Sequence, residues 1–243
     1  MSGSSPKSTG AALVVGGGVA GIQCSLDLAE GGYKVYLVEK APALGGHMAQ
    51  LDKTFPTNDC SMCTLAPKLV EAGRHLNIEI VTNSELTGLE GEPGNFNAKI
   101  YHHARFVDPD ICTSCGECSP VCPVTLPDAY NDGQNDRKAI AKLYAQAIPN
   151  TYYVTKKGHS PCKRACAVHT SAQGYVALIA DGRFAEAYTV ASEPNPFAAV
   201  CGRVCTHKCE TDCTRSEVEA PIAIAGLKRF VSDFGVAIVP MPV

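Results

Sequence analysis

The residues of this chain that are best placed to do chemistry are its thirteen cysteines. Four of them follow the spacing C-x2-C-x2-C-x3-C-P, namely Cys112, Cys115, Cys118 and Cys122 before Pro123. This is a bacterial pattern of [4Fe-4S] ligation, in which closely spaced thiolates wrap a cubane cluster and backbone N–H groups of tight turns bond its sulfides. Structural zinc sites pair two separated C-x2-C knuckles instead, so zinc is the weaker interpretation. In two-cluster proteins the fourth cysteine of such a run serves the other cluster, which leaves the assignment of Cys122 open.

A second group of six cysteines has four-residue intervals within each of its two parts. It comprises Cys162 and Cys166, then Cys201, Cys205, Cys209 and Cys213. Six thiolates exceed one cubane and fall short of two. Either other side chains or a partner complete a second cluster, or one cluster is held and two thiols are spare. A zinc or redox-thiol site is the alternative for this group.

The remaining cysteines are an isolated pair and a single residue. Cys60 and Cys63 form a lone C-x2-C, which suits half of a metal site, a redox dithiol coupled to a flavin, or no function. Cys24 falls within a predicted helix, on its apolar side, and we expect it in the core.

A glycine motif marks a nucleotide-binding unit near the start of the chain. Gly16, Gly18 and Gly21 form G-x-G-x-x-G between a predicted strand, residues 11–15, and a predicted helix, residues 19–30. Such glycines allow a tight turn and let backbone N–H groups approach a pyrophosphate at the helix N-terminus. The context therefore predicts a dinucleotide site, with a glycine turn that binds nothing as the alternative.

The residues after this motif favour FAD over NAD. Glu39 closes a second predicted strand, residues 34–38, and its carboxylate is placed to accept hydrogen bonds from ribose hydroxyls. Glu39 and Lys40, followed by Gly45 and Gly46, resemble the early part of the FAD domain in flavoproteins of the thioredoxin reductase type. No second G-x-G-x-x-G follows, so another chain is a candidate to complete the flavin site.

Periodicity predicts an α/β first half and a mostly helical second half. We expect strands at residues 78–82 and 95–101, with residues 91–94 as the turn between them, and helices at residues 175–191 and 222–234. The apolar tail, residues 236–243, either adds a late strand or docks on the surface.

These patterns divide the chain into four expected segments. They are a disordered leader (1–10), a partial Rossmann-like FAD-binding unit (11–106), a ferredoxin-like [4Fe-4S] segment (107–150) and a mainly α-helical iron–sulfur domain (151–243).

The composition indicates which partners to expect and in which compartment the protein works. A formal net charge of −3 without a long basic run argues against nucleic acid and anionic membranes as partners. The sequence shows neither a signal peptide nor an apolar stretch of the roughly 18 residues that a membrane span needs, so we expect a cytoplasmic protein. Disulfides are rare in that reducing compartment, and so many cysteines there indicate bound metal.

Two resemblances to known families cover most of the chain. The segment from Gly16 to Val124, with GGGVAGIQ, VYLVEK, GGHMAQLDKTFPTNDCSMC, LAPK and CTSCGECSPVCPV, resembles the A subunit of heterodisulfide reductase. The segment from Cys162, with CGRVC, KCE, DC and IAIAGLKRF, resembles the N-terminal iron–sulfur domain of the small subunit of glutamate synthase. An upstream C-x2-C pair of the latter is missing, because residues 154–157 stand in its place.

The first resemblance implies FAD, [4Fe-4S] clusters and a place in a multi-subunit redox complex. It also implies that Cys60 and Cys63 lie near both flavin and cluster, as candidate ligands. We therefore expect an electron-transfer subunit with two or three clusters that works with other iron–sulfur and flavin subunits, and in which no side-chain acid or base need act. The alternatives are a flavin-dependent thiol or pyridine-nucleotide reductase that uses Cys60 and Cys63, and a non-catalytic iron–sulfur assembly adaptor.

Overall fold

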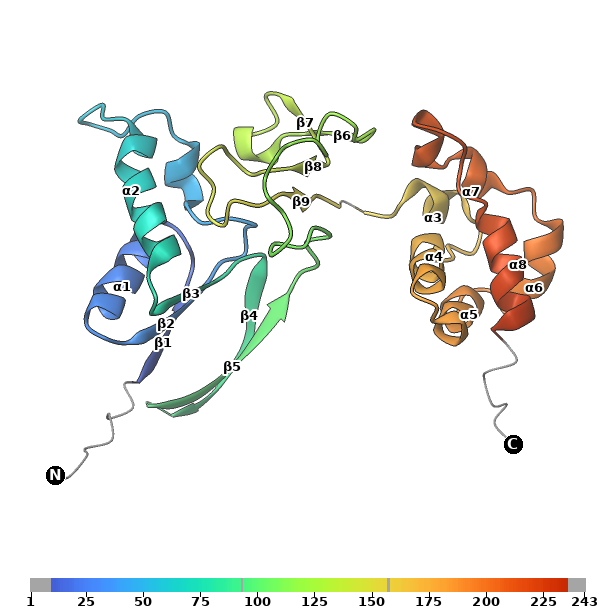
Figure 1. Ribbon diagram of the computed structural model, residues 1–243, viewed down its shortest axis with the longest axis horizontal. Helices are drawn as coiled ribbons and strands as arrows, with labels where there is room; N and C mark the ends of the chain where they lie inside the picture. The colour runs from blue at the N-terminus through green and yellow to red at the C-terminus, as the bar shows by residue number, and fades with distance from the viewer. Residues whose placement is uncertain (1–9, 93, 157, 236–243) are drawn as a thin grey trace. The chain divides into compact units, whose positions relative to one another are not determined.

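The computed structural model describes residues 10–92, 94–156 and 158–235, in two compact units (Figure 1). The first unit is Met1–Thr155 and the second is Lys156–Val243. The expected disordered leader, except for Gly10, and the expected role of the tail at residues 236–243 both lie outside the described residues.

A three-stranded parallel sheet forms the centre of the first unit. Its order is β1 (Ala11–Val15), β2 (Lys34–Val38) and β3 (Ile78–Val81). Helix α1 (Val19–Glu30) links the first two strands, which confirms the predicted β-α-β unit, and α2 (Ser61–Arg74) precedes β3.

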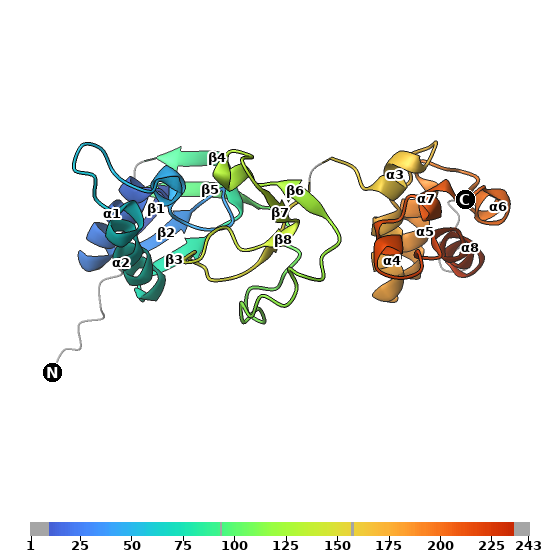
Figure 2. The ribbon, with the colours of Figure 1, turned by 90° about the horizontal axis from the view of Figure 1, so that it is seen from above.

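One face of this sheet is covered by the two helices, as Figures 1 and 2 both show. Side chains on a strand alternate between faces, so Val35 and Leu37 of β2 point to the helices and are fully buried. They pack with Ile22 of α1 and Leu65 of α2 in one apolar cluster. Tyr36 points the other way and stays exposed.

The predicted hairpin has a different first strand from the one expected. Strand β4 (Ser84–Glu92) pairs antiparallel with β5 (Asn95–His102), whereas β3 belongs to the parallel sheet. The prediction missed β4 because Gly88 and Gly91 and several glutamates interrupt its apolar alternation, and its register shifts between Leu86 and Gly88. Glycine within a strand often accompanies such a bulge.

The cysteine-rich segment between residues 103 and 124 is described without any helix or strand. Short ladders follow it: β6 (Thr125–Pro127) with β7 (Asp136–Lys138), the single-turn helix η2 (Ala129–Asn131) between them, and β8 (Ile140–Ala141) with β9 (Tyr153–Val154). The chain then returns to the α/β core, where the Leu44 amide donates to the Ile148 carbonyl at 2.8 Å.

The second unit is helical. Its elements are α3 (Pro161–Ala165), α4 (Ala172–Ala180), α5 (Phe184–Ser192), α6 (Ala198–Val204), α7 (Lys208–Thr211), η3 (Thr214–Glu217) and α8 (Ile224–Phe234). Tyr175 is fully buried at the centre, and its hydroxyl donates to the Ile224 carbonyl at 3.0 Å. This bond ties α4 to the start of α8.

One helix prediction in this unit is wrong. The expected single helix over residues 175–191 is two helices, because the chain turns at residues 181–183 and Gly182 takes φ +74°. Glycine adopts this left-handed conformation without steric cost, so it ends α4 and lets α5 fold back on it. The helix expected over residues 222–234 begins two residues later, at Ile224.

Candidate functional site

The glycine motif forms a tight turn between β1 and α1. Gly16 has φ +106°, and its amide donates to the Val38 carbonyl at 2.8 Å. A Cβ atom on Gly21 would lie 1.8 Å from the Gly16 carbonyl oxygen, so only glycine fits there. Gly18 caps α1 without a side-chain bond, and a Cβ on Gly16 or Gly18 would meet nothing within 4 Å. The turn therefore leaves open space beside the uncapped N–H groups of a helix start, as a pyrophosphate requires.

A second glycine loop is joined to the first through its backbone. The Gly45 amide donates to the Gly17 carbonyl at 2.7 Å, and Gly46 lies so close that its Cβ would be 3.1 Å from the Gly18 Cα atom. Both Gly45 (φ +123°) and Gly46 (φ +55°) hold backbone conformations that favour glycine. After Gly45 the chain enters the short helix η1 (Gly46–Gln50). The structure thus brings together all five predicted cofactor-binding glycines.

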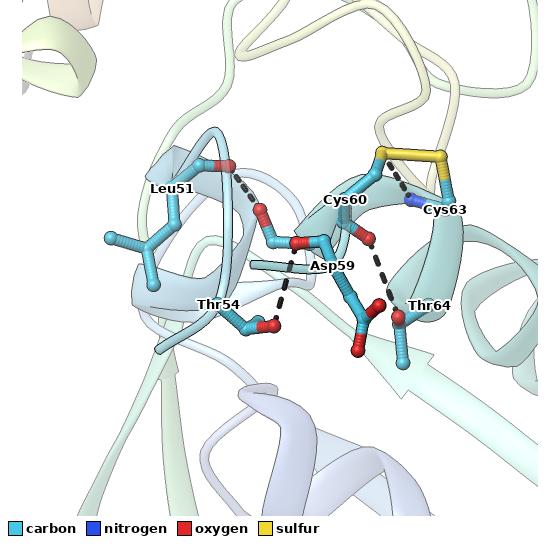
Figure 3. The surroundings of a disulfide bond; sticks show 7 residues. Leu51, Thr54, Asp59, Cys60, Cys63 and Thr64 are labelled. Atoms are coloured by element: carbon cyan, nitrogen blue, oxygen red, sulfur yellow. Dashed lines mark hydrogen bonds between the residues drawn. A yellow bond between two sulfur atoms is a disulfide. The ribbon is translucent and has the colours of Figure 1, made fainter. Parts of the chain in front are cut away.

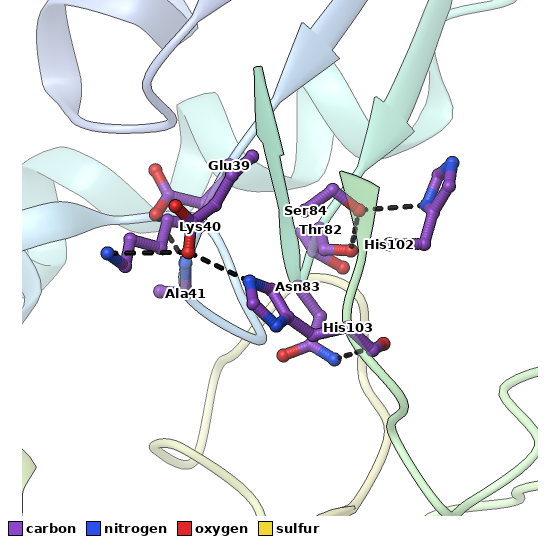
Figure 4. Close-up of polar contacts among 9 residues, drawn as sticks. Glu39, Lys40, Ala41, Thr82, Asn83, Ser84, His102 and His103 are labelled. Atoms are coloured by element: carbon purple, nitrogen blue, oxygen red, sulfur yellow. Dashed lines mark hydrogen bonds and ion pairs between the residues drawn. The ribbon is translucent and has the colours of Figure 1, made fainter. Parts of the chain in front are cut away.

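Glu39 lies in this loop region, and its carboxylate accepts hydrogen bonds from backbone amides. Its Oε2 atom accepts from the Gly17 amide at 2.5 Å. Its Oε1 atom accepts from the Ala41 amide at 2.6 Å, and both of these residues are drawn in Figure 4. The expected bonds to ribose hydroxyls stay a prediction. In the structure Oε2 holds the glycine turn and Oε1 holds the chain just after β2, roles that the sequence did not reveal.

Lys40 points to the hairpin instead of the glycine loop. Its ammonium lies 3.4 Å from the Glu85 carboxylate, which also faces His103 Nε2 at 2.8 Å. The hydrogen bond with His103, followed by that with Lys40, lowers the pKa of Glu85. Figure 4 shows His102 beside Ser84 on the same hairpin, with Nδ1 and Oγ 2.9 Å apart. Lys40, Glu85 and His103 thus link the loop after β2 to the hairpin of β4 and β5.

A cavity of about 270 Å³ adjoins the second glycine loop, and Gly46, Tyr144 and Arg137 contribute to its wall. Arg137 donates from Nη2 to Thr155 Oγ1 at 2.6 Å. Its Nε atom lies 3.2 Å from Asp128 Oδ1, but the two atoms do not have the geometry of a hydrogen bond. Its Nη1 atom is buried without a partner among the described residues. A buried donor of this kind is costly unless a bound group satisfies it. Arg137 was not predicted from the sequence, because nothing near it in the chain marks a site.

Three of the four cysteines in the C-x2-C run line one cavity. Cys112, Cys115 and Cys118 surround about 300 Å³, together with Tyr152 from a distant part of the unit. Two residues of the run, Ser114 (φ +60°) and Gly116 (φ +90°), turn the backbone between the cysteines.

Cys122 does not line this cavity among the described residues, although it lies near it. Its Sγ atom is 3.6 Å from the Val124 carbonyl oxygen. Burial raises the pKa of the Cys118 thiol, and the negative charges of Cys115, Cys112 and Cys122 add to the effect. The four thiols are therefore close enough for a shared cationic group to favour their thiolate forms.

The six cysteines of the second unit divide between two cavities. One cavity of about 300 Å³ is lined by four of them, which are Cys166, Cys201, Cys205 and Cys209. A separate, largely apolar cavity of about 410 Å³ is lined by the other two, Cys162 and Cys213, with Val176, Ile222 and Ile224. Six thiols that looked like one series in the sequence are thus four and two in space.

The four-cysteine cavity also receives residues that the sequence did not mark, Asn195 and Lys228. Burial raises the pKa of Cys166, but hydrogen bonds from Thr170 and Val168 and the charge of Lys228 outweigh it, and the pKa is lowered overall. At Cys209 burial and the Glu210 carboxylate raise the pKa, and Lys228 opposes them. The surroundings therefore favour the thiolate form at Cys166 more than at Cys209.

The sizes of these cavities indicate whether a single metal ion or a cluster would fit them. Among the described residues, no three cysteine, histidine, aspartate or glutamate side chains converge closely enough to hold a single metal ion. A zinc ion needs its sulfur ligands at about 2.3 Å. Thiols spread around several hundred cubic ångströms fit a multi-atom cluster better than one ion.

Cys60 and Cys63 are joined by a disulfide at the start of α2 (Figure 3). Cys60 caps the helix, and its Sγ accepts from the Cys63 amide at 3.1 Å. Thr64 Oγ1 donates to the Cys60 carbonyl at 3.3 Å. Both cysteines are exposed, so the pair is accessible to thiols in solution. The sulfur atoms bond each other here, and their role as metal ligands stays a prediction.

The predicted position of Cys24 is wrong. It was expected in the core, but it is exposed on α1. The buried face of this helix runs through Ile22, Ser25, Leu26 and Ala29. Cys24 lies off that stripe, because a residue two positions after Ile22 points to nearly the opposite side of a helix.

Family models match three parts of the chain. Residues 12–73 match an FAD dependent oxidoreductase family, residues 105–124 a 4Fe-4S binding domain, and residues 140–238 the family described as dihydropyrimidine dehydrogenase domain II, 4Fe-4S cluster. These matches confirm the predicted types of cofactor, FAD and [4Fe-4S] clusters, whereas the bounds of the expected segments stay a prediction. No helix of the described ranges has the length and apolar character to cross a bilayer.

Curated relatives belong to one kind of reductase. The second iron–sulfur A subunit of CoB–CoM heterodisulfide reductase from Methanopyrus kandleri is 53% identical over 146 residues, which cover 60% of this chain and 22% of that protein. The A subunit of ferredoxin:CoB–CoM heterodisulfide reductase from Methanosarcina mazei is 40% identical over 170 residues, 68% of this chain and 21% of that protein. The chain thus spans about a fifth of the length of these relatives.

Among solved structures, L-proline dehydrogenase from P. horikoshii overlaps 38% of this chain and 19% of its own, with 24% sequence identity and a TM-score of 0.34. The sequence matches are far stronger than this overlap. The chain is therefore homologous over about 60% of its length to the A subunit of heterodisulfide reductase, and its residues 140–238 match the 4Fe-4S domain of the dihydropyrimidine dehydrogenase type.

Proposed function

We propose that this chain is a cytoplasmic electron-transfer subunit of a heterodisulfide reductase-like complex, in which it relays electrons between FAD and [4Fe-4S] clusters. The observation that carries the proposal is the gathering of cysteines around two cavities, one in each unit. The relatives' names specify heterodisulfide reductase subunits, and we extend that role to this chain.

The glycine loops are the proposed FAD site. Gly16, Gly18 and Gly21 shape the turn that receives the pyrophosphate, and Gly45 and Gly46 extend the same backbone surface. Glu39 holds this turn, and the unpartnered Nη1 atom of Arg137 is a donor for an acceptor of the bound nucleotide. Lys40 would have to leave its pairing with Glu85 to reach the cofactor. When bound, FAD accepts or gives electrons in pairs, and the chain's own residues bind and orient it.

The first proposed cluster site uses the C-x2-C run. Cys112, Cys115 and Cys118 supply three thiolates around one cavity in a ferredoxin-like segment. Cys122 is the proposed fourth ligand, since it completes the C-x2-C-x2-C-x3-C spacing. Tyr152 lines the same cavity, and its hydroxyl would lie 3.3 Å from a Cβ atom on Gly116 of the run. Burial, and then the charges of Cys118, Cys115 and Cys112, raise its pKa.

The second proposed cluster site lies in the helical unit. Cys166, Cys201, Cys205 and Cys209 line one cavity and meet the four-thiolate requirement of a cubane. Cys162 and Cys213 supply only two thiols at the other cavity, so a third cluster there needs ligands from outside the described residues or from a partner protein. Other iron–sulfur and flavin subunits of the complex are the proposed partners.

The test is the amount of iron, acid-labile sulfide and flavin per chain after anaerobic purification. Two cubanes contribute about eight iron atoms and three contribute about twelve. We expect at least the former, with FAD bound by the chain alone or when its partner subunits are present. Purified chain and complex with neither iron nor flavin would contradict the proposal.

A second candidate function rests on the disulfide between Cys60 and Cys63. A flavin-dependent thiol or pyridine-nucleotide reductase would pass an electron pair from reduced flavin to this disulfide, giving two thiols as two protons are taken up. It predicts that NAD(P)H bleaches the bound flavin without any partner subunit. Flavin that stays oxidised under NAD(P)H and that only a redox partner reduces would exclude this candidate.

A further inference from the structure

Lys228 is a buried cation in the wall of the four-cysteine cavity. It lies on α8, far along the chain from most of the cysteines, and only 9% of its surface is exposed. It lines this cavity together with Cys166 and Cys209.

No carboxylate among the described residues forms an ion pair with Lys228. Glu210 is the acidic residue near Cys209, but its Oε1 atom accepts from the Ala225 amide at 2.8 Å and its Oε2 atom faces His207 at 3.5 Å. Asp233, on the same helix as Lys228, pairs with Arg203 at 2.6 Å. A largely buried lysine without a carboxylate partner is unfavourable, and the groups that Lys228 meets in this cavity are the cysteine thiols.

The proposed cluster would supply a negative charge. A [4Fe-4S] core held by four thiolates has a net negative charge that grows by one unit when the cluster is reduced. A fixed positive charge in a site of low dielectric therefore stabilises the reduced form more than the oxidised form. The ammonium has no lone pair, so it does not compete with the cysteines as a ligand.

We propose that the positive charge of Lys228 raises the reduction potential of a [4Fe-4S] cluster held by Cys166, Cys201, Cys205 and Cys209. The inference rests on the proposed function and adds a residue that sets the cluster's potential without touching the iron as a ligand. It gives this cluster a higher potential than the same four cysteines would without the lysine.

The chain offers matched controls for this role. Lys208 lines the same cavity but is exposed, where water and salt screen its charge. Arg229 follows Lys228 on α8, is exposed, and lies 3.7 Å from Asp233. Replacing Lys208 or Arg229 by Met therefore removes a positive charge from the same unit without disturbing a buried side chain.

The experiment is an EPR-monitored redox titration of the full chain in its complex, with iron measured on the same samples. We compare wild type with Lys228→Met, Lys228→Gln and Lys228→Arg, and with Lys208→Met and Arg229→Met. A signal that disappears in Cys205→Ser identifies the cluster in question. Lys228→Met and Lys228→Gln are expected to lower its midpoint potential, Lys228→Arg to restore it, and the two controls to leave it unchanged. Each tenfold change in the ratio of reduced to oxidised cluster corresponds to about 59 mV.

Two failures are distinguishable. If a Lys228→Met or Lys228→Gln variant keeps its iron and its midpoint is that of wild type, Lys228 does not set the potential and this inference is overturned, while the proposed cluster stands. Two uncharged replacements are used so that one variant that loses iron does not end the test. If Cys205→Ser leaves iron and every EPR signal unchanged, no cluster lies in this cavity, and the proposed second cluster fails with the inference.

Discussion

Gly45 donates its backbone N–H to the carbonyl oxygen of Gly17 at 2.7 Å, and this bond joins the loop after β2 to the glycine turn before α1. The contact is between backbones, so it depends on small residues on both sides. Gly46 also needs to be small, because a Cβ atom there would lie 3.1 Å from the Gly18 Cα atom. The proposed FAD surface is thus made from two loops that are distant in sequence and held together by glycines.

The first prediction concerns Gly46→Ala. The backbone at Gly46 has φ +55°, and an alanine there costs about 1–2 kcal/mol and pushes against Gly18. We expect lower FAD content per chain, measured by flavin absorbance after gentle purification. Gly182→Ala is the matched control, since φ is +74° there and a Cβ meets nothing within 4 Å. It should cost similar stability and leave FAD content unchanged; equal flavin in both variants would count against the proposed site.

The second prediction concerns Glu39→Gln. Glu39 accepts hydrogen bonds from two backbone amides, and glutamine replaces one acceptor oxygen with a donor. We expect the free energy of unfolding of this unit to fall by about 1–3 kcal/mol, measured by urea denaturation. Glu79→Gln is the control, because Glu79 forms an exposed pair with Lys34 at 3.1 Å and such pairs contribute less than about 1 kcal/mol. Similar losses in the two variants would show that Glu39 does not hold the loop.

The third prediction concerns the C-x2-C run. Cys115→Ser removes a thiolate from the cavity that Cys112 and Cys118 share. We expect about four fewer iron atoms per chain, which is one cubane, measured by iron and sulfide assay. Cys24→Ser should keep the iron of wild type, because Cys24 is exposed on α1 and lines none of the three cysteine cavities. Full iron in Cys115→Ser would remove this cluster from the proposal.

The fourth prediction separates the cysteines of the helical unit. Cys201→Ser should lose about four iron atoms per chain, because Cys201 lines the four-cysteine cavity. Cys213→Ser should keep that iron in the isolated chain, because Cys213 lines the other cavity with only Cys162. The reverse result would show that the cluster uses a different set of ligands from the one that this cavity indicates.

The fifth prediction concerns the disulfide. With Cys60 and Cys63 both replaced by Ala, we expect unchanged iron, since the structure bonds these sulfurs to each other. In wild type, mild reduction should expose two additional thiols to an alkylating reagent, because both residues are on the surface. A drop in iron in the double variant would instead support the interpretation of this pair as half of a metal site.

Much of the first unit was accessible from local sequence, because its signals are short in range. The strand from Ala11 to Val15, the helix from Val19 to Glu30 and the strand from Lys34 to Val38 follow from apolar periodicity and the glycines between them. Strand β4 was missed because its glycines and glutamates obscure that periodicity. Cys24 was misplaced, because the helix was predicted correctly but its buried side was not.

The sequence by itself determined the types of cofactor, since cysteine and glycine spacings encode the local turns that bind clusters and pyrophosphates. Only the tertiary structure decided which cysteines share a cavity, because evenly spaced residues on several helices meet or separate according to how those helices pack. Cys209 and Cys213 are four residues apart in the chain, yet they line different cavities. Lys228 joins Cys166 for the same reason, because helix packing brings α8 to that cavity.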